Sequence, residues 1–114
     1  MPSELIIEVE KPQDGVVVAR PVGEVDLASS PNLRTSLGQI VAESPARLII
    51  DLSKVPYMDS SGVATLVEAL QQSRRHSTVL VLACLQDRVR SVFEIARLDT
   101  VFDIQPDMKS ALGD

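Results

Sequence analysis

The chain has 114 residues, of which 45% are hydrophobic and 24% charged, so it fits a single domain over residues 1–114 with one hydrophobic core. Eleven Lys and Arg against sixteen Asp and Glu give a formal charge of −5, the wrong sign for neutralising nucleic-acid phosphates or an anionic membrane. Aromatic residues make up only 3% of the chain, which leaves few platforms for stacking bases. We therefore expect no nucleic-acid and no membrane partner.

The first half of the chain predicts two strands, a helix and a third strand. Strands are expected at residues 5–9 and 16–21, separated by a turn over residues 11–15 that contains Pro, Asp and Gly. A helix is expected from about residue 30 to 41, because serines and a first-turn proline precede apolar residues at helical spacing. Residues 48–52 form an apolar run that suits a strand covered on both faces.

The second half continues the alternation of helices and strands. It predicts a helix at 60–72, a buried strand at 79–83, and a helix whose inward face carries Val89, Val92, Phe93 and Ala96. A short strand at 101–104 and a last helical turn within 106–112 complete the order ββαβαβαβα. This order predicts an α/β domain with a mixed central sheet and helices mainly on one face.

The loop over residues 56–62 is the segment best suited to carry chemistry, because it follows a buried strand and precedes a helix. We expect the N–H groups of that helix end to solvate a hydroxyl or an added phosphate at Ser60. A simpler interpretation is that Ser60 caps the helix and Gly62 permits close packing. Against it, Asp59, Ser60 and Ser61 are three cap-competent residues where one suffices.

A second polar cluster precedes the first helix. It contains Gly23 to Asp26, followed by Ser29 and Ser30. For Gly23 a turn and for Ser30 a helix cap are sufficient explanations. Asp26 is an acidic loop residue outside any apolar stripe, so we expect it to contribute little to stability. The alternative is that Asp26 caps a turn, in which case its loss would cost about 1 kcal/mol.

Enzymatic activity is not expected. A nucleophilic Ser60 would need His76 as its base, but a helix from residue 60 to about 74 separates them by roughly 20 Å. The Gly-x-Ser-x-Gly elbow is also missing, since Met58 stands two residues before Ser60. The single histidine and the single cysteine, Cys84, cannot build a zinc site of thiolates and imidazoles, so we expect no metal site.

We expect the protein to be cytoplasmic. One cysteine cannot form an intramolecular disulfide, and we interpret Cys84 as a small core residue. The acidic residues 1–10 lack the basic region of a signal peptide. The longest apolar run, residues 79–85, is too short to span a membrane.

Nearly the whole chain resembles the STAS-domain anti-sigma-factor antagonists of bacteria. Residues 23–26 (GEVD) resemble their Gly-Glu-hydrophobic-Asp segment, and residues 57–62 (YMDSSG) resemble their phosphorylation loop. Residues 48–52 are similar to the family's third strand and residues 86–101 to its third-helix region. Two departures are Arg75-His76-Ser77, where the family often has Gly-Gly, and Val63-Ala64, where it often has Leu-Gly.

This resemblance implies partner switching in transcription regulation. Ser60 would be the phospho-acceptor of a phosphoprotein, with Ser61 as the alternative, and Asp26, Asp59, Ser61 and Gly62 would lie on the surface that meets the partner. In the family, the unphosphorylated antagonist binds an anti-sigma-factor serine kinase and frees the sigma factor. That kinase uses ATP to add the phosphate, which blocks binding, and a metal-dependent serine phosphatase removes it. The resemblance implies that this chain itself holds no nucleotide, metal or other cofactor.

Two other functions remain compatible with the residues. One is a non-switching STAS scaffold or adaptor, such as a stressosome component or an accessory subunit of lipid transport. The other is a STAS domain that senses a small ligand. The chain has no Gly-rich phosphate cradle and few aromatic residues to line a pocket, so we rank the sensor last.

Overall fold

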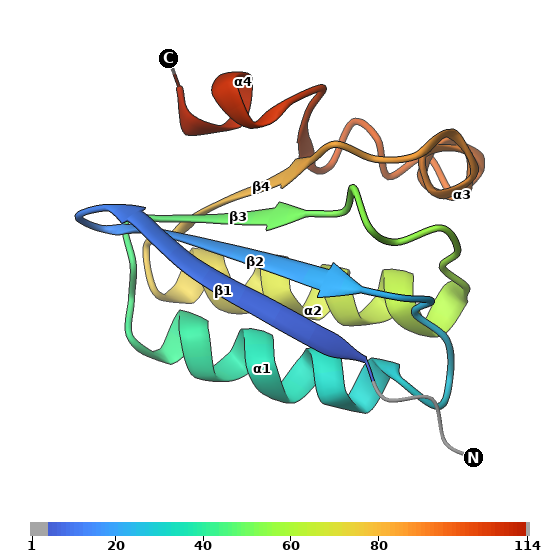
Figure 1. Cartoon of the computed structure of the whole chain (residues 1–114), viewed down its shortest axis with the longest axis horizontal. Coiled ribbons are helices and arrows are strands. Elements are labelled where there is room, and N and C mark those ends of the chain that lie inside the picture. Colours follow the sequence, from blue (N-terminus) through green and yellow to red (C-terminus); the bar gives the residue numbers. More distant parts are fainter. Residues whose placement is uncertain (1–4, 114) are drawn as a thin grey trace.

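Five strands form one mixed sheet in the order β1-β2-β3-β4-β5 in the computed structural model, which describes residues 5–113 (Figure 1). Strand β1 runs antiparallel to β2, and the other neighbouring strands run parallel. The strands are β1 (Ile6–Gln13), β2 (Val16–Val22), β3 (Arg47–Asp51), β4 (Val79–Ala83) and β5 (Asp103–Gln105). The helices are α1 (Ser30–Ala42), α2 (Ser60–Arg75), α3 (Asp87–Ile95) and α4 (Met108–Leu112). The expected fold class and element order are confirmed.

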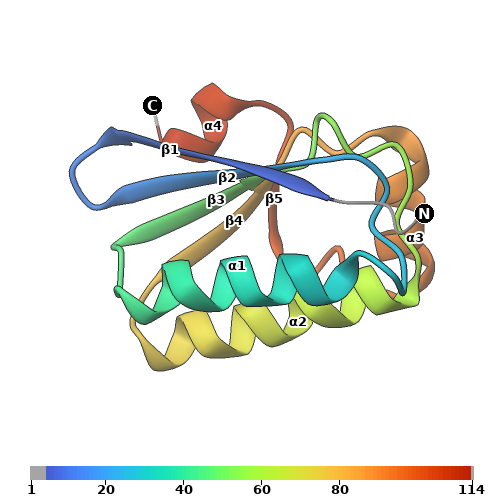
Figure 2. The ribbon, with the colours of Figure 1, turned by 60° about the horizontal axis from the view of Figure 1, so that its bottom comes forward.

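Helices α1 and α2 cover one face of the sheet, whereas the short α4 lies on the other and α3 lies beyond one end (Figure 2). Side chains alternate between the faces along each strand, so the central strands bury residues on both sides. Facing α1 and α2 are Val17, Ala19, Leu48, Ile50, Leu80 and Leu82. Facing α4 are Val16, Val18, Ile49, Val81 and Ala83. The apolar runs of β3 and β4 reflect this burial on both faces.

The β1–β2 connection is tighter than the sequence indicated. The turn expected over residues 11–15 is confirmed only at Asp14 and Gly15, because β1 continues to Gln13. Gly15 has φ of 77°, in the left-handed region that glycine adopts without strain. The pairing shifts between Glu10 and Gln13. Pro12 lies in this irregular stretch of an edge strand, where its missing N–H is tolerated.

The predicted boundaries after α3 also need correction. The last strand is Asp103–Gln105 rather than residues 101–104. Phe102 packs edge-to-face against Phe93 with ring centroids 5.4 Å apart, and its N–H bonds to the carbonyl of Leu98. Ala96 is exposed and caps the C-terminus of α3, so it does not belong to the inward face. Burial of the Phe93–Phe102 pair therefore keeps Phe102 out of the last strand, although the local sequence pattern predicted a strand from residue 101.

Asp51, a charged residue in the buried strand β3, takes part in a cluster of ion pairs on the α4 side of the sheet. Arg20 Nε donates to Asp51 Oδ2 over 2.9 Å, and Arg20 Nη1 donates to Glu10 Oε1 over 2.8 Å. Burial opposes ionisation of Asp51 most strongly, but the N–H of Ser53 and the Arg20 guanidinium together hold its pKa below the ordinary value. Asp51 therefore stays ionised although it is only 3% exposed.

Cys84 directly follows β4 and packs half-buried against the core on the α4 side of the sheet, so it lies at the edge of the core that we expected it to join. Its φ of 61° is left-handed, so the chain turns away from the sheet at this residue. Burial, followed by the negative charge of Asp51, raises the pKa of the Cys84 thiol. The neutral thiol is therefore favoured at neutral pH.

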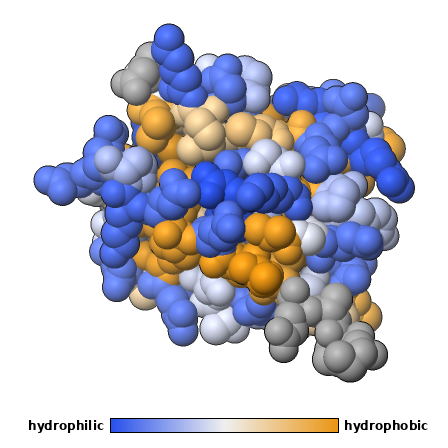
Figure 3. All heavy atoms as spheres, in the orientation of Figure 1, coloured by the Kyte–Doolittle hydropathy of each residue, from blue (hydrophilic) through white to orange (hydrophobic). Residues whose placement is uncertain are grey.

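Two surface hollows lie on the β1 side of the molecule. A groove of about 230 Å³ opens between β1 and α1, and a hollow of about 470 Å³ lies beside the β1–β2 turn. Figure 3 shows apolar surface next to a band of hydrophilic side chains in the orientation of Figure 1. The groove is lined by Ile7, Val9, Lys11, Val17, Ser36, Gln39, Ile40 and Glu43. Neither hollow includes a residue of the two polar loops.

Candidate functional site

The two polar clusters identified in the sequence meet at the carboxyl ends of β2 and β3. Val25 and Met58 form an isolated parallel bridge. The N–H of Val25 donates to the carbonyl of Tyr57 over 3.0 Å, and the N–H of Asp59 donates to the carbonyl of Val25 over 3.1 Å. The loop before α1 and the loop before α2 therefore form one hydrogen-bonded unit, at the right-hand end of Figure 1.

Asp59, rather than Ser60, is the N-cap of α2. Its Oδ1 accepts hydrogen bonds from the N–H of Ser61 over 2.9 Å and of Gly62 over 3.3 Å. The Ser61 hydroxyl donates to the same oxygen over 2.5 Å. This hydroxyl, followed by the N–H groups of Gly62 and Ser61, lowers the pKa of Asp59. The simpler interpretation that Ser60 caps the helix is therefore wrong.

Ser60 is the first residue of α2 and is exposed, whereas Ser61 is half-buried. The Ser60 hydroxyl makes no hydrogen bond within the part of the chain that the structure describes. The Asp59 carboxylate accepts hydrogen bonds from the N–H groups of Ser61 and Gly62. The main-chain carbonyl of Asp59 accepts from the N–H of Val63 over 3.1 Å. These groups are not free to solvate a phosphate, contrary to our expectation.

Gly62 is buried, which corrects its expected place on the partner-facing surface. A Cβ atom at this position would lie 2.6 Å from Met58 Cγ and 2.8 Å from Val25 Cγ1. Both distances are shorter than atoms at van der Waals contact. Gly62 therefore lets α2 begin directly against the bridge between the two loops, which is the packing role considered for it above.

The carboxylate of Asp26 organises the turn that leads into α1. Its Oδ1 accepts from the N–H groups of Ala28 and Ser29, each over 3.0 Å. The N–H of Asp26 in turn donates to the Ser29 hydroxyl over 2.9 Å. Ser29 is the N-cap residue of α1 and Ser30 its first residue, so the expected Ser30 cap is wrong. The expectation that Asp26 contributes little to stability also needs revision.

Asp26→Ala is expected to lower the free energy of unfolding by about 1 kcal/mol, because two N–H groups of the turn lose their acceptor. Urea denaturation followed by circular dichroism measures the change. Asp26→Asn is the matched control, since its side-chain oxygen accepts the same bonds and should restore most of the stability. Equal stability of the wild-type and alanine chains would show that the turn does not need this carboxylate.

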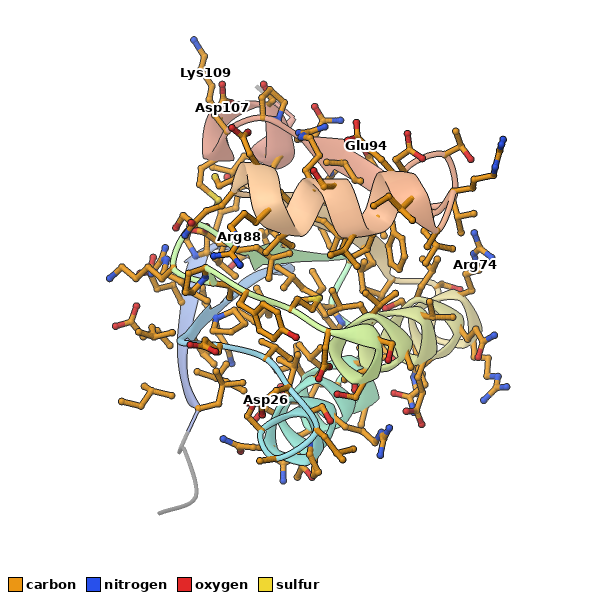
Figure 4. The ribbon with its side chains drawn as sticks, turned by 90° about the vertical axis from the view of Figure 1, so that its right-hand side faces the viewer. Asp26, Arg74, Arg88, Glu94, Asp107 and Lys109 are labelled. Carbon is orange, nitrogen blue, oxygen red and sulfur yellow. The ribbon has the colours of Figure 1, made fainter. Side chains whose placement is uncertain are left out.

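Two exposed apolar side chains belong to the bridged loops. Leu27 is 77% exposed and Tyr57 is 39% exposed. Figure 4 looks onto this end of the molecule, with Asp26 at the start of α1 and Arg88 in the first turn of α3. The sequence analysis did not single out Leu27. The available signal was a large apolar residue directly after Asp26, within a polar loop.

Other candidate chemistry lies away from these loops or is not formed. His76 caps the C-terminus of α2, at the opposite end from Ser60, and its Nδ1 lies 3.0 Å from the Ser44 hydroxyl oxygen. A serine–histidine pair with Ser60 is therefore not assembled. Across residues 5–113, no group of three or more His, Cys, Asp or Glu side chains is arranged to hold a metal ion. None of the helices described is long and apolar enough to cross a membrane.

Comparison with known proteins identifies the family. The anti-sigma-B factor antagonist of Listeria monocytogenes is 35% identical over 83 residues, which cover 73% of each chain. That of Bacillus subtilis is 37% identical over 82 residues, covering 72% of this chain and 74% of the relative. The crystal structure of an anti-sigma factor antagonist from Mycobacterium paratuberculosis matches with a TM-score of 0.87 at 29% identity, covering 96% of this chain and 92% of that one. The sequence also matches the STAS domain family over residues 7–111, so the chain belongs to that family.

Proposed function

We propose that this protein is an anti-sigma-factor antagonist controlled by phosphorylation of Ser60. The unphosphorylated chain binds an anti-sigma-factor serine kinase in the cytoplasm and thereby frees the sigma factor. A metal-dependent serine phosphatase removes the phosphate and returns the chain to its unphosphorylated form. The observation that carries the proposal is the exposed Ser60, whose hydroxyl has no hydrogen-bond partner among residues 5–113, held at the start of α2 in a hydrogen-bonded pair of loops. The names of the relatives support the same function. The chain acts as a substrate and has no turnover of its own.

The proposed switch depends on charge at a contact surface. Phosphorylation adds roughly −1.5 to −2 charges at Ser60, beside the Asp59 carboxylate. The N–H groups of Ser61 and Gly62 already bind Asp59, so they leave the added charge largely uncompensated. A partner that packs against this surface must then desolvate that charge. Since Ser60 is exposed, the domain itself has no buried contact to lose.

The binding surface in this proposal contains Leu27, Tyr57, Asp26, Asp59 and Ser60 from the two bridged loops, together with the half-buried Ser61. An exposed leucine next to a regulated serine suits an apolar contact that excludes water. Hydrogen bonds to Asp26 already fix the backbone of the turn that carries Leu27, so this turn does not have to become ordered on binding. Such preorganisation lowers the entropic cost of association.

Purification of the chain from its native cells tests this function. Mass spectrometry should locate phosphate on Ser60 and identify a serine kinase of the anti-sigma class among the co-purifying proteins. A large stable assembly with no sigma-factor regulator would instead indicate the scaffold or adaptor. A co-purifying small molecule, with no phosphate on the loop, would indicate the ligand sensor.

Leu27→Ala is expected to weaken kinase binding by about 10-fold or more, while the free energy of unfolding changes by less than about 0.5 kcal/mol. Titration calorimetry and thermal melting measure the two quantities. Val79→Ala is the control, because Val79 is 49% exposed and lies at the amino end of β4, away from the loops. Equal binding by both variants would remove Leu27 from the contact surface.

A further inference from the structure

Two adjacent serines in the loop before α2 differ sharply in their surroundings. The Ser60 side chain is exposed. The Ser61 side chain is half-buried, and its hydroxyl donates to Asp59 Oδ1 over 2.5 Å. The backbone of Ser61 is held as well, since its carbonyl accepts from the Thr65 hydroxyl over 2.9 Å and its N–H donates to Asp59 over 2.9 Å.

We propose that Asp59 directs phosphorylation to Ser60 by engaging the hydroxyl of Ser61. This inference rests on the proposed function and assigns a selection role within it. Asp59 is a positioning residue here and does not touch the transferred phosphoryl group. The selection is built into the substrate loop, so it does not require the kinase to distinguish two neighbouring hydroxyls.

Phosphoryl transfer makes different demands on the two serines. The serine Oγ forms a bond to the γ-phosphorus of ATP, the bond from that phosphorus to the bridging oxygen breaks, and ADP leaves. The hydroxyl proton passes to a base on the kinase. At Ser60 the oxygen and its proton are accessible. At Ser61 the proton is committed to a charge-assisted hydrogen bond, and the kinase's base would have to displace Asp59 to receive it.

The Asp59 carboxylate adds electrostatic and geometric obstacles at Ser61. Its negative charge lies within hydrogen-bonding distance of the Ser61 oxygen, so it repels a triphosphate that approaches this oxygen. The N–H groups of Ser61 and Gly62 hold the carboxylate in place before the kinase arrives. The carboxylate therefore does not have to be ordered by the encounter itself.

Substitution of Asp59 tests the inference through the position of the phosphate. The wild-type chain and its variants are incubated with ATP and the kinase that co-purifies with the chain, and fragment-ion mass spectrometry measures the ratio of phospho-Ser61 to phospho-Ser60. We expect that ratio to rise about 10-fold or more in Asp59→Ala, the change that a lost charge-assisted hydrogen bond implies. Asp59→Asn should give an intermediate ratio, because its oxygen still accepts hydrogen bonds but carries no charge.

Matched variants separate site selection from loss of a helix cap. Asp107 caps α4 by accepting from the N–H of Ser110 over 2.7 Å, so Asp107→Ala removes a comparable cap elsewhere and should leave the ratio unchanged. Ser60→Ala should accept no phosphate at Ser61. The double variant Ser60→Ala with Asp59→Ala should accept phosphate there.

The possible outcomes distinguish the inference from the function on which it rests. A wild-type chain that receives no phosphate contradicts the proposed function and the inference with it. If the wild-type chain is phosphorylated on Ser60 and Asp59→Ala keeps the same ratio, the function stands and the selection role is wrong. If folded Asp59 variants receive no phosphate at all, the selection role is also wrong, because the kinase would then need Asp59 to recognise the loop.

Discussion

Ser60→Asp is expected to bind the anti-sigma-factor kinase about 100-fold or more weakly than the wild-type chain, because a desolvated, unpaired charge at an interface costs several kcal/mol. The domain should keep its stability. Ser60 is exposed, so water solvates the added carboxylate and screens its repulsion by the neighbouring Asp59. Affinity and stability should therefore change independently of each other. Titration calorimetry and thermal melting on the same samples test this expectation.

Ser60→Ala is the matched control for that experiment. The hydroxyl of Ser60 is exposed and α2 is capped by Asp59, so the free energy of unfolding should change by less than about 0.5 kcal/mol. Binding should match that of the unphosphorylated wild-type chain and should persist after incubation with ATP. If Ser60→Asp binds as tightly as Ser60→Ala, charge at this position is not the switch.

Gly62→Ala is expected to lower the free energy of unfolding by about 1 to 3 kcal/mol, the usual cost of overpacking a core. Its Cβ would lie 2.6 Å from Met58 Cγ and 2.8 Å from Val25 Cγ1, so the start of α2 or the bridge between the loops must shift. Because this bridge aligns Asp59 and Ser60 with the loop before α1, kinase binding should fall as well. Urea denaturation and titration calorimetry measure the two losses.

Gly38→Ala tests whether this loss comes from packing rather than from glycine chemistry in general. Gly38 lies within α1, and a Cβ there would be 3.9 Å from Gln72 Oε1, an ordinary contact. Alanine favours the helical backbone over glycine by up to about 1 kcal/mol, so Gly38→Ala should stabilise the chain. If the Gly62→Ala variant were as stable as the wild-type chain, the start of α2 would have adapted to the extra methyl group.

The sequence determined the buried, strongly periodic elements of this protein. Strand β4 was predicted with its observed bounds, and β3, α1 and α2 were predicted to within a few residues at each end. Local pattern suffices there because each element has a continuous apolar face. It failed at the bulged edge strand β1, and at β5, where packing of Phe102 on Phe93 moved the boundary.

The sequence also identified both loops of the candidate site, since polar residues at strand ends stand out from the apolar runs beside them. Only the tertiary structure decided their roles. It assigned the cap of α2 to Asp59, buried Gly62 and left Leu27 exposed. The burial of Gly62, for example, arises from the pairing of Val25 with Met58, which come from two loops distant in sequence. Hydrogen-bond partners and burial at such a site are contributed by distant parts of the chain, so local sequence pattern does not contain them.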